Sequence, residues 1–322
     1  MIDIFTHILP PKYREALEKL ATRGRIPLPR AEGIQCSNPV LLDVDCRLTV
    51  MGEFPDMTQV LTMVGPPLEA IAEAEDTVDL AKIANDEMAE LVTRHPDKFI
   101  AVATLPMNNM DAALKEVDRA INDLQLRGVQ IFTSINGKPL DSPVFLPLYQ
   151  KMDQYDLPIW LHPVKEMTEP DYPGEQSSRY GLAAMIGWPH ATSMAIMRLA
   201  GSGILEKYPN LKFITHHSGG TVPYLAERIR HSPFKYENLT RPIIDSLRLF
   251  YYDTAVQGNV PNLMCAHALC GADHMLLGTD FPMVHADLVK ATIRSVNEMP
   301  IPEWEKSKIF EENARKILKI PL

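Results

Sequence analysis

The sequence predicts an α/β fold, a (β/α)8 TIM barrel, from three observations. Short apolar runs bounded by turn residues recur eight times along the chain, and longer stretches with a helix-like pattern separate them. This alternation is typical of a parallel sheet with helical crossovers, and eight units favour closure into a barrel over an open sheet. Several runs, among them VLTMV and MLLG, are apolar on both faces, as strands covered inside and outside should be.

The predicted strands lie between turn residues, and runs such as VLTMV and VQIF are too short and too rich in Val and Ile to be buried helices. They are expected at residues 2–9, 58–64, 99–105, 128–133, 158–162, 212–216, 249–254 and 274–279. The helices that cover them are expected at residues 69–95, 110–126, 143–156, 181–206, 220–231, 260–269 and 286–297, with a terminal helix at 303–319.

Two connections are longer than ordinary loops and form insertions after strands 1 and 5. Residues 20–57 contain many prolines and few periodic apolar residues, and residues 163–180 are polar and rich in turn formers. In a barrel both leave from the C-terminal rim, so both are expected to fold over the site as lids. No repeat or domain-scale linker interrupts the chain, so residues 1–322 are expected to form a single domain.

The composition excludes several classes of function. A net charge of -9 and a pI near 5.6 argue against a nucleic-acid partner, because phosphate binding needs a basic face. The first residues are already strand-like and leave no room for an export signal. No apolar run approaches the roughly 20 residues that span a bilayer. A cytoplasmic protein without membrane partners is therefore expected.

Four predicted strands end in a polar side chain of a kind that does chemistry. They are His7 in IDIFTHILP, His162 in PIWLHP, His217 in KFITHHSGG and Asp280 in HMLLGTDFP. Taken singly, a histidine here could be an idle rim residue, and Asp280 could cap the next helix. Because barrels keep their chemistry at the C-terminal ends of their strands, the four together predict one site.

These residue types suit one divalent metal ion, zinc first and manganese as an alternative. His7, His162 and Asp280 supply the three protein ligands that are usual in a catalytic site. His217 would be a fourth ligand or a proton shuttle beside a metal-bound water. A helix cap would explain part of the Ser-Gly-Gly-Thr motif that follows, but it does not explain the adjacent His216.

The chain resembles the amidohydrolase superfamily, in the branch of the aminocarboxymuconate-semialdehyde, resorcylate and carboxyvanillate decarboxylases. The resemblance extends over nearly the whole length, through the segments DIFTHILP, HPDKFIAVATLPM, GVQI, LHP, GWPHATSMAI, GILEKYPNLKFITHHSGGTVPY, LGTDFP and ENARKIL. It implies a metal bound by His7, His162 and Asp280, with His217 acting on the substrate or on bound water. It also implies a homodimer and the non-oxidative decarboxylation of a small aromatic or muconate-type carboxylic acid.

Phe5 departs from the pattern of this family. The first strand normally reads Asp-Ile-His-x-His or carries a Glu at the first ligand, and here Phe5 stands at that position. Three ligands could then hold the metal more weakly, another side chain could substitute, or the site could work without a metal, as in lactonase-like members. Asp3 faces the same way but lies about 7 Å deeper in the strand, so it is not expected to substitute.

Four residues are further candidates for substrate contact: Phe5, Arg47, Trp188 and His216. Arg47, in the first expected lid, could meet a substrate carboxylate, although exposed basic residues usually face solvent. Trp188 lies early in a predicted helix after the fifth strand, where packing would explain it equally well.

Three functions are compatible with these residues. The first is a metal-assisted carboxy-lyase, in which His217 or Asp280 transfers a proton to the carbon that loses carbon dioxide. The second is a lactone or amide hydrolase on the same barrel, with or without a metal. The third is a catalytically impaired barrel kept for binding, which would have a pocket filled by Phe5.

Overall fold

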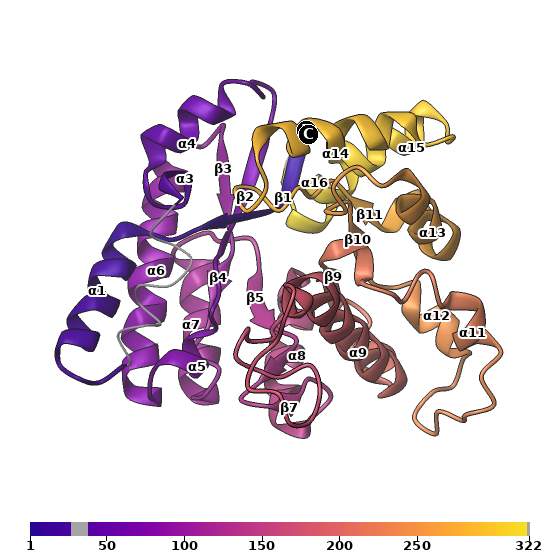
Figure 1. The fold of residues 1–322 in the computed structure, drawn as a ribbon, viewed down its shortest axis with the longest axis horizontal. Helices are drawn as coiled ribbons and strands as arrows, with labels where there is room; N and C mark the ends of the chain where they lie inside the picture. Colours follow the sequence, from indigo (N-terminus) through magenta and orange to yellow (C-terminus); the bar gives the residue numbers. More distant parts are fainter. Residues whose placement is uncertain (27–37, 321–322) are drawn as a thin grey trace.

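The computed structural model describes residues 1–26 and 38–320, and its centre is a barrel of parallel strands surrounded by helices (Figure 1). Hydrogen bonds join β1, β2 and β3 on one side and β4, β5, β8, β9, β10 and β11 on the other. The strands are β1 (Ile2–Ile8), β2 (Thr58–Met63), β3 (Phe99–Ala101), β4 (Ala103–Thr104), β5 (Val129–Phe132), β8 (Pro158–His162), β9 (Lys212–Thr215), β10 (Tyr251–Asp253) and β11 (Met275–Leu276).

The two groups of strands join at both of their edges, which makes the barrel eight-stranded as predicted. β3 and β4 are halves of one strand interrupted at Val102, the first half pairing with β2 and the second with β5. At the other edge the amide of Ile4 donates to the carbonyl of Leu277 at 2.8 Å, and that of His7 to Phe281 at 2.7 Å. The first strand therefore lies directly beside the segment that carries Asp280.

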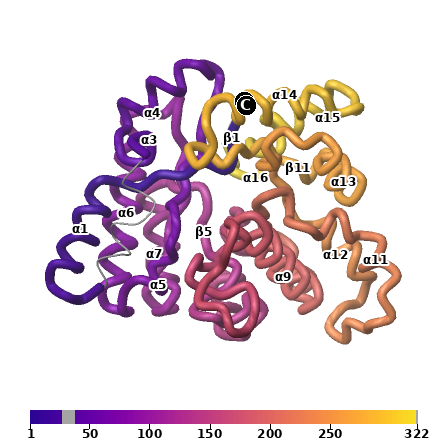
Figure 2. The backbone as a smooth tube through the Cα atoms, viewed as in Figure 1, coloured from indigo at the N-terminus to yellow at the C-terminus, as the bar shows by residue number. Residues whose placement is uncertain are grey.

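Helices cover the outside of the barrel between successive strands, and they lie close to the predicted positions (Figure 1). The principal ones are α5 (Leu68–Ile71), α6 (Ala74–Arg94), α7 (Met110–Asn122), α8 (Leu146–Tyr155), α9 (Trp188–Gly201), α10 (Ile204–Lys207), α13 (Val260–Cys270), α14 (Ala286–Glu298), α15 (Glu303–Ser307) and α16 (Asn313–Leu318). Figure 2 shows the last of them, α16, returning beside β1 at the start of the chain.

The barrel interior is filled by bulky apolar side chains, as closure of eight parallel strands requires. A buried cluster takes Val60 from β2, Trp160 from β8 and Ile214 from β9. The indole of Trp160 donates to the carbonyl of Ile4 at 2.9 Å, so its one polar atom is satisfied across the barrel. Polar groups at the open end consequently stand on a rigid apolar floor.

The first insertion differs from its prediction. Helix α1 (Pro11–Thr22), which was not predicted, extends into its start, and the insertion also contains α3 (Pro39–Leu42) and α4 (Val44–Met51). Helix α1 begins at a proline, which is favoured in a first turn, and buries Tyr13, Leu17 and Ala21 at a spacing of four. Residues 27–37 of the expected lid lie outside the described residues.

Several stretches predicted as single helices are divided, among them 69–95 into α5 and α6 and 303–319 into α15, a π-helical turn and α16. Within 181–206 a π-helical turn (Ala183–Gly187) precedes α9, and within 220–231 only α11 (Ala226–Arg230) is an α-helix. A short helix that was not predicted, α12 (Ile243–Leu247), follows it. Searching the described ranges 1–26 and 38–320 for a helix that is both long and apolar enough to cross a membrane finds none.

Candidate active site

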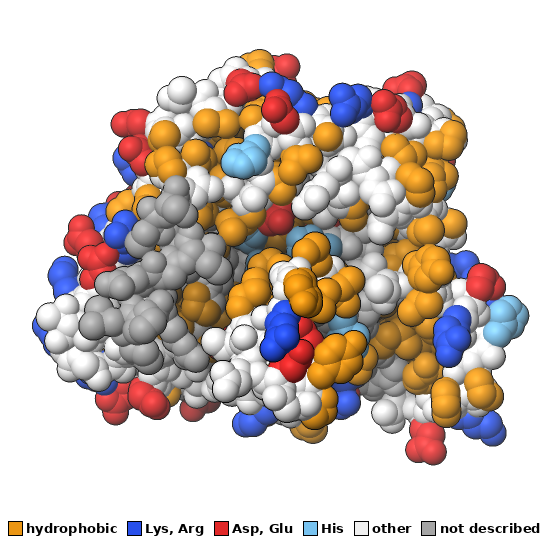
Figure 3. Space-filling model, in the orientation of Figure 1, with side chains coloured by type: hydrophobic (Ala, Val, Ile, Leu, Met, Phe, Trp, Pro, Cys, Tyr) orange, Lys and Arg blue, Asp and Glu red, His pale blue; other side chains and the backbone are white. Residues whose placement is uncertain are grey.

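Side chains from four strand ends meet at the open end of the barrel. His7 belongs to β1, His162 ends β8, and His216 and His217 follow β9 directly. Asp280 follows β11 and is brought to His7 by the closing hydrogen bonds. Figure 3 shows histidine surface and acidic surface in a depression near the middle of this face. The structure thus brings together the four residues that the sequence singles out.

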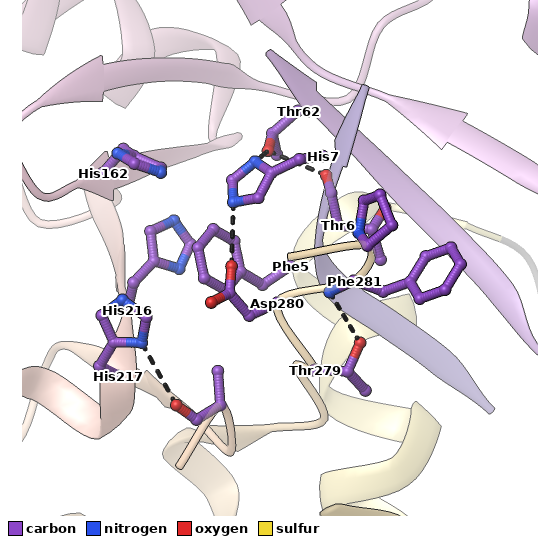
Figure 4. A network of polar contacts seen from close by, with 12 residues as sticks. Phe5, Thr6, His7, Thr62, His162, His216, His217, Thr279, Asp280 and Phe281 are labelled. Carbon is purple, nitrogen blue, oxygen red and sulfur yellow. Dashed lines mark hydrogen bonds and ion pairs between the residues drawn. The ribbon is translucent and has the colours of Figure 1, made fainter. Parts of the chain in front are cut away.

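Phe5 lies at the centre of this group of imidazoles (Figure 4). Its ring is fully buried and is stacked on the ring of His216, with centroids 3.4 Å apart and planes 13° from parallel. The other ring centroids lie 4.6 Å away for His7, 5.8 Å for His217 and 5.9 Å for His162. An apolar ring therefore occupies the position among the imidazoles where a further donor would be expected.

Each of the four imidazoles has its Nδ1 atom next to a fixed acceptor. Nδ1 of His162 lies 2.7 Å from the carbonyl oxygen of Pro163, and Nδ1 of His217 lies 3.3 Å from the carbonyl oxygen of Ala255. The hydroxyl of Thr62 donates to the carbonyl of Thr6 at 2.9 Å, so it accepts from Nδ1 of His7 at 3.0 Å.

The fourth imidazole, His216, donates from Nδ1 to Oδ2 of Asp253 at 3.0 Å. In all four rings the proton is placed on Nδ1, so Nε2 keeps its lone pair unless a second proton binds. Partners of this kind also hold metal-binding histidines in the tautomer and orientation that they need. The site therefore presents a set of Nε2 lone pairs.

His7 and Asp280 are in direct contact, with Nε2 and Oδ1 3.1 Å apart. Because Nδ1 of His7 already donates, this contact requires a second proton on the ring or a cation shared by both groups. Burial acts to raise the pKa of Asp280, but the hydrogen bond with His7 and the surrounding imidazoles outweigh it and lower that pKa. Asp280 is therefore a carboxylate at neutral pH.

The imidazoles of His162 and His216 are neutral. Burial lowers the pKa of both rings well below the ordinary value, and neighbouring histidines act in the same direction. Neutral imidazole is the form that binds a metal ion or accepts a hydrogen bond. Both rings are therefore electron-pair donors at physiological pH.

The donor chemistry of the site fits a divalent ion. Imidazole nitrogens and a carboxylate are the ligands that zinc and manganese take, and Nε2 of His216 is buried without a hydrogen-bond partner. The placement is not that of an assembled ligand sphere: across residues 1–26 and 38–320, no three His, Cys, Asp or Glu side chains are arranged to hold a metal ion. The Phe5 ring lies between the donors.

Asp3 holds the turn that presents Asp280. Its carboxylate accepts from the amide of Thr279 at 3.0 Å and from the hydroxyl of the same residue at 2.5 Å. Asp280 has a positive φ of 68°, which costs free energy in a non-glycine residue, so the turn needs such support. Burial raises the pKa of Asp3 to about 7. As expected, Asp3 does not join the group at the open end.

Asp253 is a functional candidate that the sequence reasoning missed. It ends β10 and is fully buried, and its Oδ1 accepts from the amides of Ser218 and Ala255 at 2.9 and 3.1 Å. Burial raises its pKa to about 6. The signal was available, because Asp253 lies near the C-terminal end of the predicted strand 249–254, as Asp280 lies at the end of 274–279.

Arg47 is not on an exposed lid, and that expectation is wrong. Its side chain is fully buried on α4, where Nη1 donates to the carbonyl of His7 at 2.6 Å and Nε to Gln59 at 2.9 Å. The guanidinium carbon also lies 5.2 Å from the centre of the Phe281 ring. Arg47 therefore stabilises the end of β1 from within the protein.

Trp188 connects two parts of the rim. It begins α9 and is partly buried, and its indole donates to the carbonyl of Lys165 at 3.1 Å. This bond ties α9 to the insertion that follows β8.

A separate surface cavity of about 570 Å³ lies beside α9. It is lined by residues that include Asp141, Arg198 and Lys207 and by none of the active-site residues described above. This cavity is therefore separate from the residues at the barrel mouth.

Comparison with known proteins gives one family and one kind of enzyme. A family model described as amidohydrolase matches residues 44–320. A 2-amino-3-carboxymuconate-6-semialdehyde decarboxylase of Dictyostelium discoideum is 28% identical over 98% of this chain and 91% of its own length. A gamma-resorcylate decarboxylase of Rhizobium radiobacter is 31% identical over 87% of this chain and 88% of its own.

The same relationship appears in three dimensions. The crystal structure of a dihydroxybenzoic acid decarboxylase from Polaromonas sp. JS666 has a TM-score of 0.81 and is 27% identical in sequence. The match covers 99% of this chain and 96% of that one, and that structure contains manganese and the inhibitor 2-nitroresorcinol. The similarity thus includes a protein with a divalent metal.

Proposed function

This chain belongs to the amidohydrolase family, and on that premise we propose that it is a metal-assisted, non-oxidative carboxy-lyase of a small aromatic or muconate-type carboxylic acid. One observation carries the proposal: Nε2 of His7 lies 3.1 Å from the carboxylate of Asp280 at the barrel mouth, beside the imidazoles of His162 and His217, whose Nδ1 atoms are held by backbone carbonyls. The relatives named above, which act on carboxylic acids of this class, support it.

We assign the metal to His7, His162 and Asp280, with zinc or manganese as the ion. When bound, the ion supplies positive charge that attracts the substrate carboxylate or an adjacent hydroxyl. Asp280 and His7 are then held together without a second proton on the imidazole. Thr62 and Pro163 fix the His7 and His162 rings, so that both present the nitrogen that coordinates.

His217 is the proposed proton carrier. In decarboxylation the bond between the ring carbon and the carboxylate breaks, its electron pair stays on that carbon, and a proton takes the place of carbon dioxide. The Nδ1 atom of His217 is held by the carbonyl of Ala255, which leaves Nε2 to hold and transfer the proton. Asp280 is the second candidate for this transfer.

The walls of the substrate pocket come from the same segments. We propose that Trp188 contacts the substrate where α9 meets the insertion after β8. Phe5 and His216 are buried and stacked on each other, and they form the floor beneath it. Arg47 is not assigned to this pocket, because its side chain is fully buried and two of its guanidinium nitrogens, Nη1 and Nε, donate to the carbonyl of His7 and to Gln59.

We further propose that the protein is a homodimer and is located in the cytoplasm. Light scattering of the purified protein measures its oligomeric state.

The test measures carbon dioxide. Purified protein is incubated with gamma-resorcylate or 2-amino-3-carboxymuconate-6-semialdehyde, and carbon dioxide is quantified with the aromatic or semialdehyde product. Equal amounts of the two are expected, without any redox cofactor. Model lactones and amides are assayed in parallel. Hydrolysis of these without carbon dioxide from either acid would replace the proposal by a hydrolase, and no turnover at all would favour the binding protein.

A further inference from the structure

The buried Nε2 atom of His216 has no hydrogen-bond partner among the described residues. Its side chain is fully buried, so water does not satisfy the atom at the protein surface. Buried polar atoms are nearly always paired, because an unpaired one costs the free energy of its lost hydration. An atom left in this state at a functional site indicates a group that binds there.

The other side of the ring shows which kind of group that is. Nδ1 of His216 donates to Oδ2 of Asp253, and Oδ1 of the same carboxylate is held by the amides of Ser218 and Ala255. The ring is therefore locked in one orientation with its lone pair on Nε2. A carboxylate behind a histidine is the arrangement that orients metal ligands and makes them more basic.

The stacking of His216 on Phe5 directs that lone pair. The planes are only 13° from parallel, and the lone pair of an imidazole lies in the plane of its ring. It therefore passes alongside the Phe5 ring instead of pointing into it. The His162 ring lies 5.8 Å away at an angle of 64°, and Figure 4 shows His216 on the same side of Phe5 as His162.

We propose that His216 is a protein ligand of the divalent ion and supplies the donor that position 5 of the first strand lacks. The ion would then be held by three imidazoles, from His7, His162 and His216, and by the carboxylate of Asp280. Phe5 has a positive role in this site, because its ring packs against His216 and sets the direction of Nε2. This inference rests on the proposed function for the presence of the ion.

The first experiment measures binding of the metal alone. Metal-free protein is titrated with manganese, followed by electron paramagnetic resonance of the free ion, and with zinc against a chromogenic chelator. We compare the unaltered protein with His216→Gln. The matched control is His274→Gln, since His274 also points Nδ1 at a carbonyl, that of Phe250, and stacks on an aromatic ring, Tyr251.

One ion per chain is expected in the unaltered protein and in His274→Gln. In His216→Gln the dissociation constant should rise by at least about tenfold. Circular dichroism and thermal unfolding of the metal-free proteins establish that both variants fold. Equal affinity in all three proteins, or an unaltered protein that binds no ion at micromolar concentration, would refute the inference.

A second measurement needs no His216 variant and can therefore still refute the inference if His216→Gln does not fold. X-ray absorption at the zinc edge of the loaded protein counts imidazole ligands by the scattering of their outer ring atoms. Three are expected in the unaltered protein and also in His217→Gln, and two in either protein would exclude His216. The result is independent of turnover: three imidazoles with no carbon dioxide release would leave the inference intact and reject the proposed reaction, whereas two imidazoles with carbon dioxide release would reject the inference and leave the proposed reaction intact.

Discussion

Nε2 of His7 lies 3.1 Å from Oδ1 of Asp280, although 273 positions separate the two residues in the chain. The contact exists because the barrel closes between β1 and the segment after β11, where the amide of Asp280 donates to the carbonyl of Phe5 at 2.9 Å. Two groups that share either a proton or a cation are thus held together by backbone hydrogen bonds. A substitution of either His7 or Asp280 is therefore expected to impair the function of the other.

Replacing Asp280 by Asn should lower kcat by about 100-fold or more, because the variant loses a negative ligand and a candidate proton carrier. The measurement is carbon dioxide release under saturating substrate. Asp287→Asn is the control, since Asp287 lies on α14 with its side chain 96% exposed. Full activity in Asp280→Asn would mean that the site is assigned wrongly.

Metal affinity lost in His216→Gln should return when Phe5→His is added. The two rings are stacked 3.4 Å apart, so an imidazole at position 5 enters the same group of donors. Elemental analysis and manganese titration of the double variant measure the recovery. Phe5→Leu in the same background supplies bulk without a donor and should leave the affinity low, and recovery there would contradict a ligand role at this place.

Asp253→Asn should weaken metal binding by about 10- to 100-fold while leaving the ligands themselves in place. An amide at this position can still accept from the amides of Ser218 and Ala255, but it no longer offers a full negative charge to Nδ1 of His216. Manganese titration at constant pH measures the change. Unaltered affinity would show that the Asp253 charge does not act through His216.

Asp3 should make the protein less stable as the pH rises from 4 to 7. Its folded-state pKa of about 7 lies above the ordinary value of 3.8, so the folded protein retains a proton that the unfolded chain has released. The loss of stability is about 1.4 kcal/mol for each pH unit in this window. Urea unfolding at several pH values, with chelator present, measures it.

The comparison variant for this pH dependence is Asp3→Asn. The amide is nearly isosteric and can keep hydrogen bonds to the backbone and hydroxyl of Thr279. Its unfolding free energy should change less with pH between 4 and 7 than that of the unaltered protein. The same slope in both proteins would show that Asp3 is ionised in the folded state throughout.

Arg47→Met should destabilise the fold by about 2–4 kcal/mol, because it leaves the buried acceptors on His7 and Gln59 unpaired. The expected signature is a lower Tm, together with a KM that changes little at a temperature where the variant is folded. Arg179→Met is the control, since that side chain is 63% exposed in the insertion after β8. A large rise in KM without loss of stability would restore Arg47 as a substrate contact.

The amino-acid sequence alone was enough to predict the barrel and most of its helices and strands. Eight apolar runs require a closed parallel sheet, and such a sheet brings the C-terminal ends of its strands to one rim. The sequence therefore predicts a single site formed by the residues at these strand ends, His7, His162, His217 and Asp280. Helix α1 was not predicted, because it is short and mostly polar. Its apolar face consists of Tyr13, Leu17 and Ala21.

Only the tertiary structure decided which side chains touch within that rim. The stack of Phe5 on His216, the carboxylate of Asp253 behind it and the burial of Arg47 each join segments far apart in the chain. Strand periodicity states which face a side chain occupies. It does not state which neighbour that side chain meets across the barrel, because the contact depends on how closure sets the register of strands and on the rotamer that packing allows.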